Sequence, residues 1–99
     1  MLDLIPSVVQ AVPGKDYMVY AYLNDGTVRS FDMATIIEKS APDSVFAKIA
    51  DKDIFHNTLT VLNNTVAWDV AGNRNARKCI DIDPYTVREW RVVDDPLEK

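Results

Sequence analysis

The stretch YMVYAYLNDGTVRSFD, residues 17–32, decides the fold of this 99-residue chain. Residues 17–23 and 27–31 are dense in β-branched and aromatic side chains, which are enriched in strands. Between these runs stands Asp25-Gly26, a dipeptide typical of the type I′ turn, in which both central residues take positive φ. The stretch therefore predicts a β-hairpin with a two-residue loop and with Gly26 at positive φ.

The two faces of the predicted hairpin differ in character. A two-residue loop pairs Leu23 with Val28, and strand side chains alternate between the faces. One face is apolar and is predicted to be core: Val19, Ala21, Leu23 and Val28. The other face is aromatic and amphipathic: Met18, Tyr20, Tyr22, Arg29 and Phe31.

Two interpretations of the aromatic face are open. A C-terminal helix with Val87 and Trp90 covers it, or it contacts another protein, because Tyr, Met and Arg are enriched at protein interfaces. The second interpretation names four candidate partner-binding residues: Met18, Tyr20, Tyr22 and Arg29.

The rest of the chain alternates short strand-like and helix-like segments. Further strands are predicted at residues 7–12, 58–62, 65–70 and 78–82. The predicted turns and loops are Pro13-Gly14, residues 51–55, Asn63-Asn64 and the polar loop at 71–78. Helices are predicted after three capping residues: Asp32; Ser40, with Val45, Phe46 and Ile49 on the apolar face; and Asp83, with Pro84 in the first position and an end near Trp90.

This order of elements predicts a single α+β domain over residues 1–99. It has a small, mostly antiparallel sheet, made of two hairpins plus short strands, and two to three short helices. Residues 91–99 are predicted to be a frayed tail. The predicted core consists of Val19, Leu23, Val28, Phe46, Ile49, Phe55 and Trp68.

The composition is that of an ordinary globular protein, with 47% hydrophobic and 26% charged residues. The N-terminus lacks the pattern of a signal peptide, and no apolar run reaches transmembrane length, so we expect a cytoplasmic protein with no membrane partner. The formal net charge of −4 argues against direct nucleic-acid binding and suits a basic protein partner. A lone cysteine, Cys79, excludes an internal disulfide.

The inventory of chemically active residues predicts neither an enzyme nor a cofactor. The three glycines lie in turn-like contexts and form no phosphate-binding motif. His56 and Cys79 are too few ligands for a structural zinc site, so no metal is expected. His56 with Asp53 could act as a base, but no serine stands in a recognised nucleophile context, so we name no catalytic residue.

Two charged clusters support weaker alternatives. Asp69, Asp81 and Asp83 could serve a small-ligand sensor or a minor enzyme, although alternating acids also mark any half-exposed strand. Arg74, Arg77 and Lys78 could contact an anion, an acidic partner or a nucleic acid, although a polar turn is the simpler explanation.

The order of several short motifs resembles the bacterial domain of unknown function 2442. The motifs are Asp25-Gly26-x-Val28-Arg29-x-Phe31-Asp32, then Phe46, Ile49, Asp51, Asp53 and Phe55, and finally Trp68 with Ile80-Asp81-Ile82-Asp83-Pro84. The resemblance covers residues 8–87; residues 71–78 lengthen one turn, and Val87 stands where the family often has tyrosine. It implies a small α+β bacterial protein without a known reaction, similar to the non-toxic half of toxin–antitoxin-like pairs.

The leading functional hypothesis is a non-enzymatic protein-interaction module. The partner is a small basic protein or a second copy of the chain, and the role is that of an antitoxin-like or accessory subunit in a two-protein system. A small-ligand sensor or minor enzyme is the first alternative, and a nucleic-acid-associated regulator is the second. An exposed aromatic patch would favour the module, a concave acidic pocket would favour the sensor or enzyme, and steeply salt-dependent nucleic-acid binding would favour the regulator.

Overall fold

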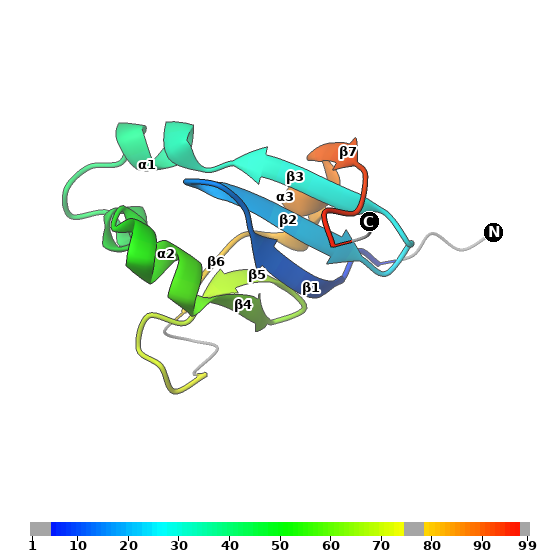
Figure 1. Cartoon of the computed structure of the whole chain (residues 1–99). Helices are drawn as coiled ribbons and strands as arrows, with labels where there is room; N and C mark the ends of the chain where they lie inside the picture. Colours follow the sequence, from blue (N-terminus) through cyan, green and yellow to red (C-terminus); the bar gives the residue numbers. More distant parts are fainter. Residues whose placement is uncertain (1–4, 75–78, 98–99) are drawn as a thin grey trace.

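The computed structural model describes residues 5–74 and 79–97, and within them the strands form two antiparallel sheets (Figure 1). The first sheet has the order β1-β2-β3-β7 and the second the order β4-β5-β6. The strands are β1 Val8–Pro13, β2 Met18–Leu23, β3 Val28–Asp32, β4 Leu59–Leu62, β5 Thr65–Trp68, β6 Ile80–Asp81 and β7 Arg91–Val93. With the three α-helices of the described chain, these sheets give the expected small α+β fold.

The first hairpin has a longer loop than the sequence predicts. The backbone N–H of Leu23 donates to the carbonyl of Thr27 at 2.9 Å, so Asn24, Asp25 and Gly26 together form a three-residue loop. Gly26 has the predicted positive φ, at 86°, whereas Asp25 is not among the described residues with positive φ. The Asp25 carboxylate instead accepts hydrogen bonds from the backbone and hydroxyl of Thr27, which holds the longer loop closed.

This extra loop residue shifts the pairing of β3 with β2 by one residue. The side chains of β3 therefore lie on the faces opposite to those predicted. Val19 pairs with Phe31, Ala21 with Arg29, and Tyr22 with Val28. Paired side chains share a face, and a one-residue shift exchanges the two faces of a strand. Arg29 and Phe31 therefore lie on the core face, with the buried side chains of Val19 and Ala21.

The second hairpin contains the tight turn that the first one lacks. Leu62 pairs with Thr65, and both intervening residues, Asn63 and Asn64, have positive φ, at 55° and 61°. A two-residue loop with positive φ at both positions is a type I′ turn. The same turn connects the two sheets, because the carbonyl of Asn64 accepts a 2.8 Å hydrogen bond from Val8 on β1.

Four short helical segments connect and cover the sheets. They are α1 Ala34–Lys39, the 3-10 helix η1 Val45–Ile49, α2 Lys52–Thr58 and α3 Pro84–Arg88. As predicted, Asp83 caps α3 with Pro84 in its first turn. The N-cap of α1 is Met33 rather than the predicted Asp32, although the Asp32 carboxylate accepts from the Ala34 N–H at 2.9 Å. Among the described helices, none is long and apolar enough to cross a membrane.

Two further local predictions are wrong in this part of the chain. The cap of η1 is Ser44, not Ser40, whose hydroxyl donates to Ile36 at the end of α1. Residues 51–55 are not a turn, because the Asp51 carboxylate accepts from two backbone N–H groups and starts α2. A capping aspartate followed by two charged residues is typical of a helix start as well as of a turn. The helical conformation buries Phe55 in the core, which favours it over the turn.

One hydrophobic core joins both sheets. Five of the seven predicted core residues are buried in this core, namely Val19, Leu23, Ile49, Phe55 and Trp68. Val28 is also buried, but the shifted register pairs it with Tyr22, so it lies on the face of β3 opposite to the one predicted. Phe46 is only half-buried, and its neighbour Val45 is 52% exposed, so the predicted apolar face of this helix is wrong. The core also includes Val87 and Trp90, which reach it from α3 and the residues that follow.

The C-terminal segment is more ordered than predicted. Arg91–Val93 forms β7, which pairs antiparallel with β3 through Val28, Arg29 and Ser30. In Figure 1, α3 lies behind the first sheet, whereas the chain after β7 passes in front of it. The two faces of β2 and β3 are thus covered by different parts of the C-terminal region.

Candidate functional site

An open cavity of about 420 Å³ lies between β3, the α1–η1 segment and the β6–α3 segment. We call it the aromatic groove. Its lining residues in the described chain are Phe31, Ile36, Phe46, Asp81, Ile82, Asp83, Thr86, Glu89 and Trp90. The groove thus draws on three stretches that are far apart in the sequence.

The floor of the groove is a pair of stacked aromatic rings. The ring centroids of Phe31 and Trp90 are 5.3 Å apart, and the ring planes differ by 12°. The shifted register of β3 turns Phe31 toward this side, and Trp90 follows directly after α3. Trp90 is 7% exposed and Ile82 beside it is 9% exposed, so these side chains are held in place by the core.

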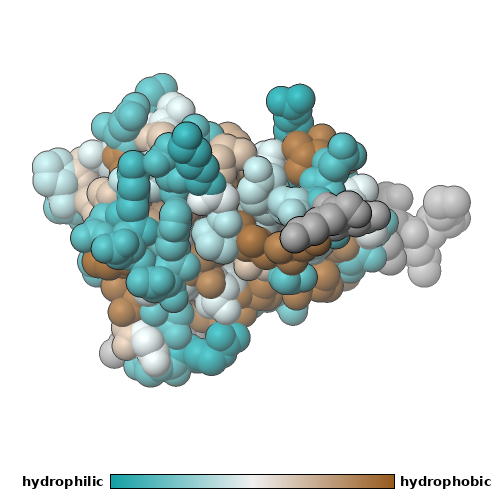
Figure 2. Space-filling model, in the orientation of Figure 1, coloured by the Kyte–Doolittle hydropathy of each residue, from teal (hydrophilic) through white to brown (hydrophobic). Residues whose placement is uncertain are grey.

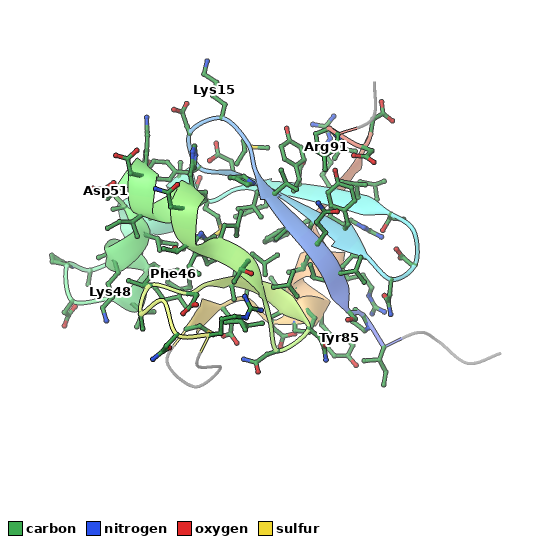
Figure 3. All side chains as sticks on the ribbon, turned by 60° about the horizontal axis from the view of Figure 1, so that its bottom comes forward. Lys15, Phe46, Lys48, Asp51, Tyr85 and Arg91 are labelled. Carbon is green, nitrogen blue, oxygen red and sulfur yellow. The ribbon has the colours of Figure 1, made fainter. Side chains whose placement is uncertain are left out.

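The side of the groove formed by α1 and η1 is apolar as well. Ile36 comes from α1 and Phe46 from η1, and both are half-buried. The Ser44 hydroxyl accepts from the Phe46 N–H at 3.2 Å, which fixes the start of this helix. Figure 3 labels Lys48 beside Phe46 on the same short helix, and Lys48 is exposed. The half-buried state of Phe46 follows from its position at an open cavity.

The rim of the groove carries three exposed carboxylates. Asp81 and Asp83 stand before α3, and Glu89 stands at its end. Asp83 accepts from the Tyr85 N–H at 2.8 Å, and Asp81 accepts from the Asn63 side-chain amide at 3.2 Å. Among the described residues that line the groove, none is Lys, Arg or His. An apolar floor beneath a negative rim attracts an apolar group that lies beside a positive charge.

Three of the four predicted partner-binding residues lie on the opposite face. Met18, Tyr20 and Tyr22 are half-buried there, rather than openly exposed. The Tyr22 hydroxyl donates to the Asp95 carboxylate, which holds the C-terminal segment against this face. Burial, followed by the hydrogen bond and charge of Asp95, raises the pKa of Tyr22 to about 12.

Gly14 is required where the Tyr20 ring crosses the β1–β2 turn. A Cβ atom at Gly14 would lie 2.6 Å from Cε2 of Tyr20 and 2.9 Å from Cβ of Met18. In Figure 2, apolar residues gather over the region of β1 and β2. The chain itself thus fills part of the face that carries Met18, Tyr20 and Tyr22, through the Tyr20–Gly14 contact and the Tyr22–Asp95 hydrogen bond.

Arg29, the fourth predicted partner-binding residue, is separated from the tyrosines by the register. Its guanidinium donates to the carbonyls of Arg88 and Trp90, at 2.9 and 3.3 Å. These carbonyls follow the last turn of α3 and lack partners within the helix. Arg29 thus ties β3 to the end of α3, and the grouping with Met18, Tyr20 and Tyr22 on one face is wrong.

The predicted acidic set is divided between two places. Asp81 and Asp83 both line the aromatic groove, whereas Asp69 lines a separate polar cavity of about 380 Å³ beside β4. Asp69 there accepts hydrogen bonds from the backbone N–H groups of Gly72 and Arg74. Within residues 5–74 and 79–97, no group of three His, Cys, Asp or Glu side chains could hold a metal ion.

The predicted basic set is only partly described. Arg74 donates to the hydroxyl of Thr60 at 3.2 Å and to the carbonyl of Val61 at 3.0 Å, so its guanidinium is held along β4. Arg77 and Lys78 lie outside the described residues. An anion site at this cluster therefore stays a prediction.

His56 and Cys79 lie apart from the aromatic groove. His56 belongs to α2, not to a turn, and its Nε2 donates to the carbonyl of Asp16 at 2.6 Å. Asp16 also pairs with Lys52 at 2.9 Å, so this contact ties α2 to the β1–β2 turn. Burial, and then the charge of Asp81, raise the pKa of the half-buried Cys79 thiol, which makes it a poorer nucleophile at neutral pH.

No protein-family model, curated protein or solved structure matches this chain. The resemblance to the domain of unknown function 2442 therefore stays a prediction.

The sequence indicates two of the three rim carboxylates, Asp81 and Asp83, through their alternating spacing, but it does not single out Glu89. It also misplaces Phe31 of the floor, because the predicted register puts this residue on the wrong side of β3. A three-residue loop with Gly at the last position is a known alternative to the type I′ turn, and the aspartate–threonine pair in Asp25-Gly26-Thr27 was its available signal.

Proposed function

We propose that this chain is a non-enzymatic protein-interaction module that binds a basic partner protein through the aromatic groove. The observation that carries the proposal is the apolar floor of Phe31 and Trp90 beneath the carboxylates of Asp81, Asp83 and Glu89. Interfaces are anchored by aromatic pockets, and a negative rim steers a positive partner toward them. The net charge of −4 acts in the same direction over a longer range.

The chemistry of the groove favours binding over catalysis. Neither Ser, Cys nor His is among its described lining residues, so it offers carboxylates as its only strong acid–base groups. One of these, Asp83, already caps α3. The role of an antitoxin-like or accessory subunit, which the resemblance to the domain of unknown function 2442 implies, is consistent with such a module.

The decisive experiment captures the partner from the native host and compares variants with matched controls. Tagged wild type and Phe46→Asp are used as bait, and bound proteins are quantified by mass spectrometry. Val45→Asp is the control, because Val45 is adjacent on η1, 52% exposed and outside the groove. We expect a small basic protein that is retained by wild type and Val45→Asp and reduced at least tenfold by Phe46→Asp. Equal retention by Phe46→Asp, with folding confirmed by circular dichroism, would refute the role of the groove.

One observation favours a second candidate, the small-ligand sensor or minor enzyme. Asp81 and Asp83 share one concave cavity whose volume lies within the range of about 300–1,000 Å³ that is usual for small-molecule sites. Thermal-shift screening against small cationic metabolites tests this candidate. A ligand that raises Tm for wild type but not for Asp81→Asn would favour it over the protein partner.

A further inference from the structure

We infer that the aromatic groove receives one bulky apolar side chain of the partner, flanked on both sides by lysine or arginine. The inference rests on the proposed function and specifies the part of the partner that is recognised. It concerns an exposed, basic segment of a protein, such as a terminal tail or a loop, rather than a whole helical face.

The size of the groove limits its occupant. A volume of about 420 Å³ lies near the lower end of the range of roughly 300–1,000 Å³ for ligand pockets. It suffices for one Leu, Met or Phe side chain with part of its backbone, whereas helices that dock in grooves use anchors spread over two turns. The stacked rings of Phe31 and Trp90 supply apolar lining for such a side chain.

The positions of Asp83 and Glu89 along α3 guide the choice of spacing for the flanking charges. Asp83 is the N-cap and Glu89 the C-cap of α3, so they lie six positions apart with five residues between them. At a rise of about 1.5 Å per residue, their Cα atoms are about 9 Å apart. In an extended peptide that rises about 3.3 Å per residue, two residues at positions i and i+3 are about 10 Å apart.

The motif that fits this geometry is a cation, two residues that include the apolar anchor, and a second cation. Asp81, two positions before Asp83, adds negative charge to the lining of the groove. Lys48, which shares η1 with Phe46, is exposed and does not line the groove. A neutral segment would leave the rim carboxylates without a cationic partner, and an acidic segment would be repelled by them. The rim therefore favours a positively charged segment, and the floor favours an apolar side chain of limited size.

The test uses capped synthetic peptides and the whole chain. The probe is Gly-Lys-Gly-Leu-Lys-Gly, with Lys→Gln at both lysines and Leu→Ser as the two control peptides. Binding is followed by NMR chemical-shift changes at Phe31, Phe46 and Trp90, with Tyr20 on the opposite face as the internal reference. We expect shifts confined to the groove, an affinity at least tenfold lower for each control peptide, and weaker binding of the probe at high salt.

Protein variants supply the complementary half of the test. Glu89→Lys should weaken the probe at least fivefold, whereas Glu38→Lys makes the same charge change at an exposed position of α1 outside the groove and should leave binding unchanged. If the Gln peptide binds as tightly as the Lys peptide, the requirement for flanking cations is overturned. Equal binding of free 2-phenylethylamine and the probe would overturn the protein-segment occupant in favour of a small ligand.

Two further outcomes separate this inference from the proposed function. If Phe46→Asp loses the partner in the capture experiment but no peptide binds, the inference of a basic peptide segment is overturned. The proposed function would still hold in that case. Concentration-dependent self-association that Glu89→Lys abolishes would assign the groove to a second copy of the chain, and it would also overturn the segment model.

Discussion

Phe31 and Trp90 stack with their ring centroids 5.3 Å apart, although 59 positions separate them in the chain. This contact packs the end of α3 against β3 and at the same time forms the floor of the aromatic groove. The same two rings therefore hold the fold together and line the proposed binding site. Variants for testing function are better placed at Phe46 or on the rim, where the side chains are less buried.

Two phenylalanines should differ in their effect on stability. Phe55 is fully buried, with ring contacts to Tyr17 and Trp68, so Phe55→Ala should lower the free energy of unfolding by about 3–5 kcal/mol. Phe46 is half-buried at an open cavity, so Phe46→Ala should cost only about 1–2 kcal/mol. Urea unfolding followed by circular dichroism measures both. Equal losses would mean that the groove is closed in solution.

Arg29 should contribute to stability and not to partner binding. Arg29→Ala removes two hydrogen bonds to the carbonyls of Arg88 and Trp90, and we expect a loss of about 1–3 kcal/mol. Arg91→Ala, at an exposed position of β7, is the matched control and should change stability by less than about 0.5 kcal/mol. An unaltered unfolding midpoint for Arg29→Ala would contradict the observed register of β3.

The Asn63-Asn64 turn should tolerate glycine and reject β-branched residues. Both residues have positive φ, so Asn64→Val should lower the free energy of unfolding by about 1–2 kcal/mol. Asn64→Gly is the control, because glycine takes this conformation without a steric penalty, and its stability should match or exceed that of wild type. Thermal unfolding measures both variants, and a reversed order would show that the turn is not of type I′.

Tyr22 should titrate above the ordinary pKa of a tyrosine side chain. Burial and Asp95 raise its pKa to about 12, above the ordinary value of 10.0, because the folded chain favours the neutral phenol. Between these two values the folded chain binds more protons than the unfolded chain, so stability falls as the pH rises through this window. Phenolate absorbance should show a late step that Tyr22→Phe removes and that Asp95→Asn moves to lower pH. A late step that persists in Tyr22→Phe would contradict the assignment.

The sequence by itself determined the class of the fold and many of its local features. The two hairpins, the positive φ of Gly26, the Asn63-Asn64 turn and the Asp83-Pro84 helix start all follow from local conformational preferences. Burial of Val19, Leu23 and Trp68 follows from the density of large apolar side chains around them. These are properties that short stretches carry without reference to the rest of the chain.

Only the tertiary structure decided which residues meet. One additional loop residue, held by Asp25 and Thr27, exchanged the faces of β3 and moved Phe31 and Arg29 to the side of α3. Pairing of β7 with β3 then ordered a segment that has little local preference of its own. The aromatic groove exists because these long-range contacts bring β3, η1 and α3 together, and no short stretch of sequence encodes such a meeting.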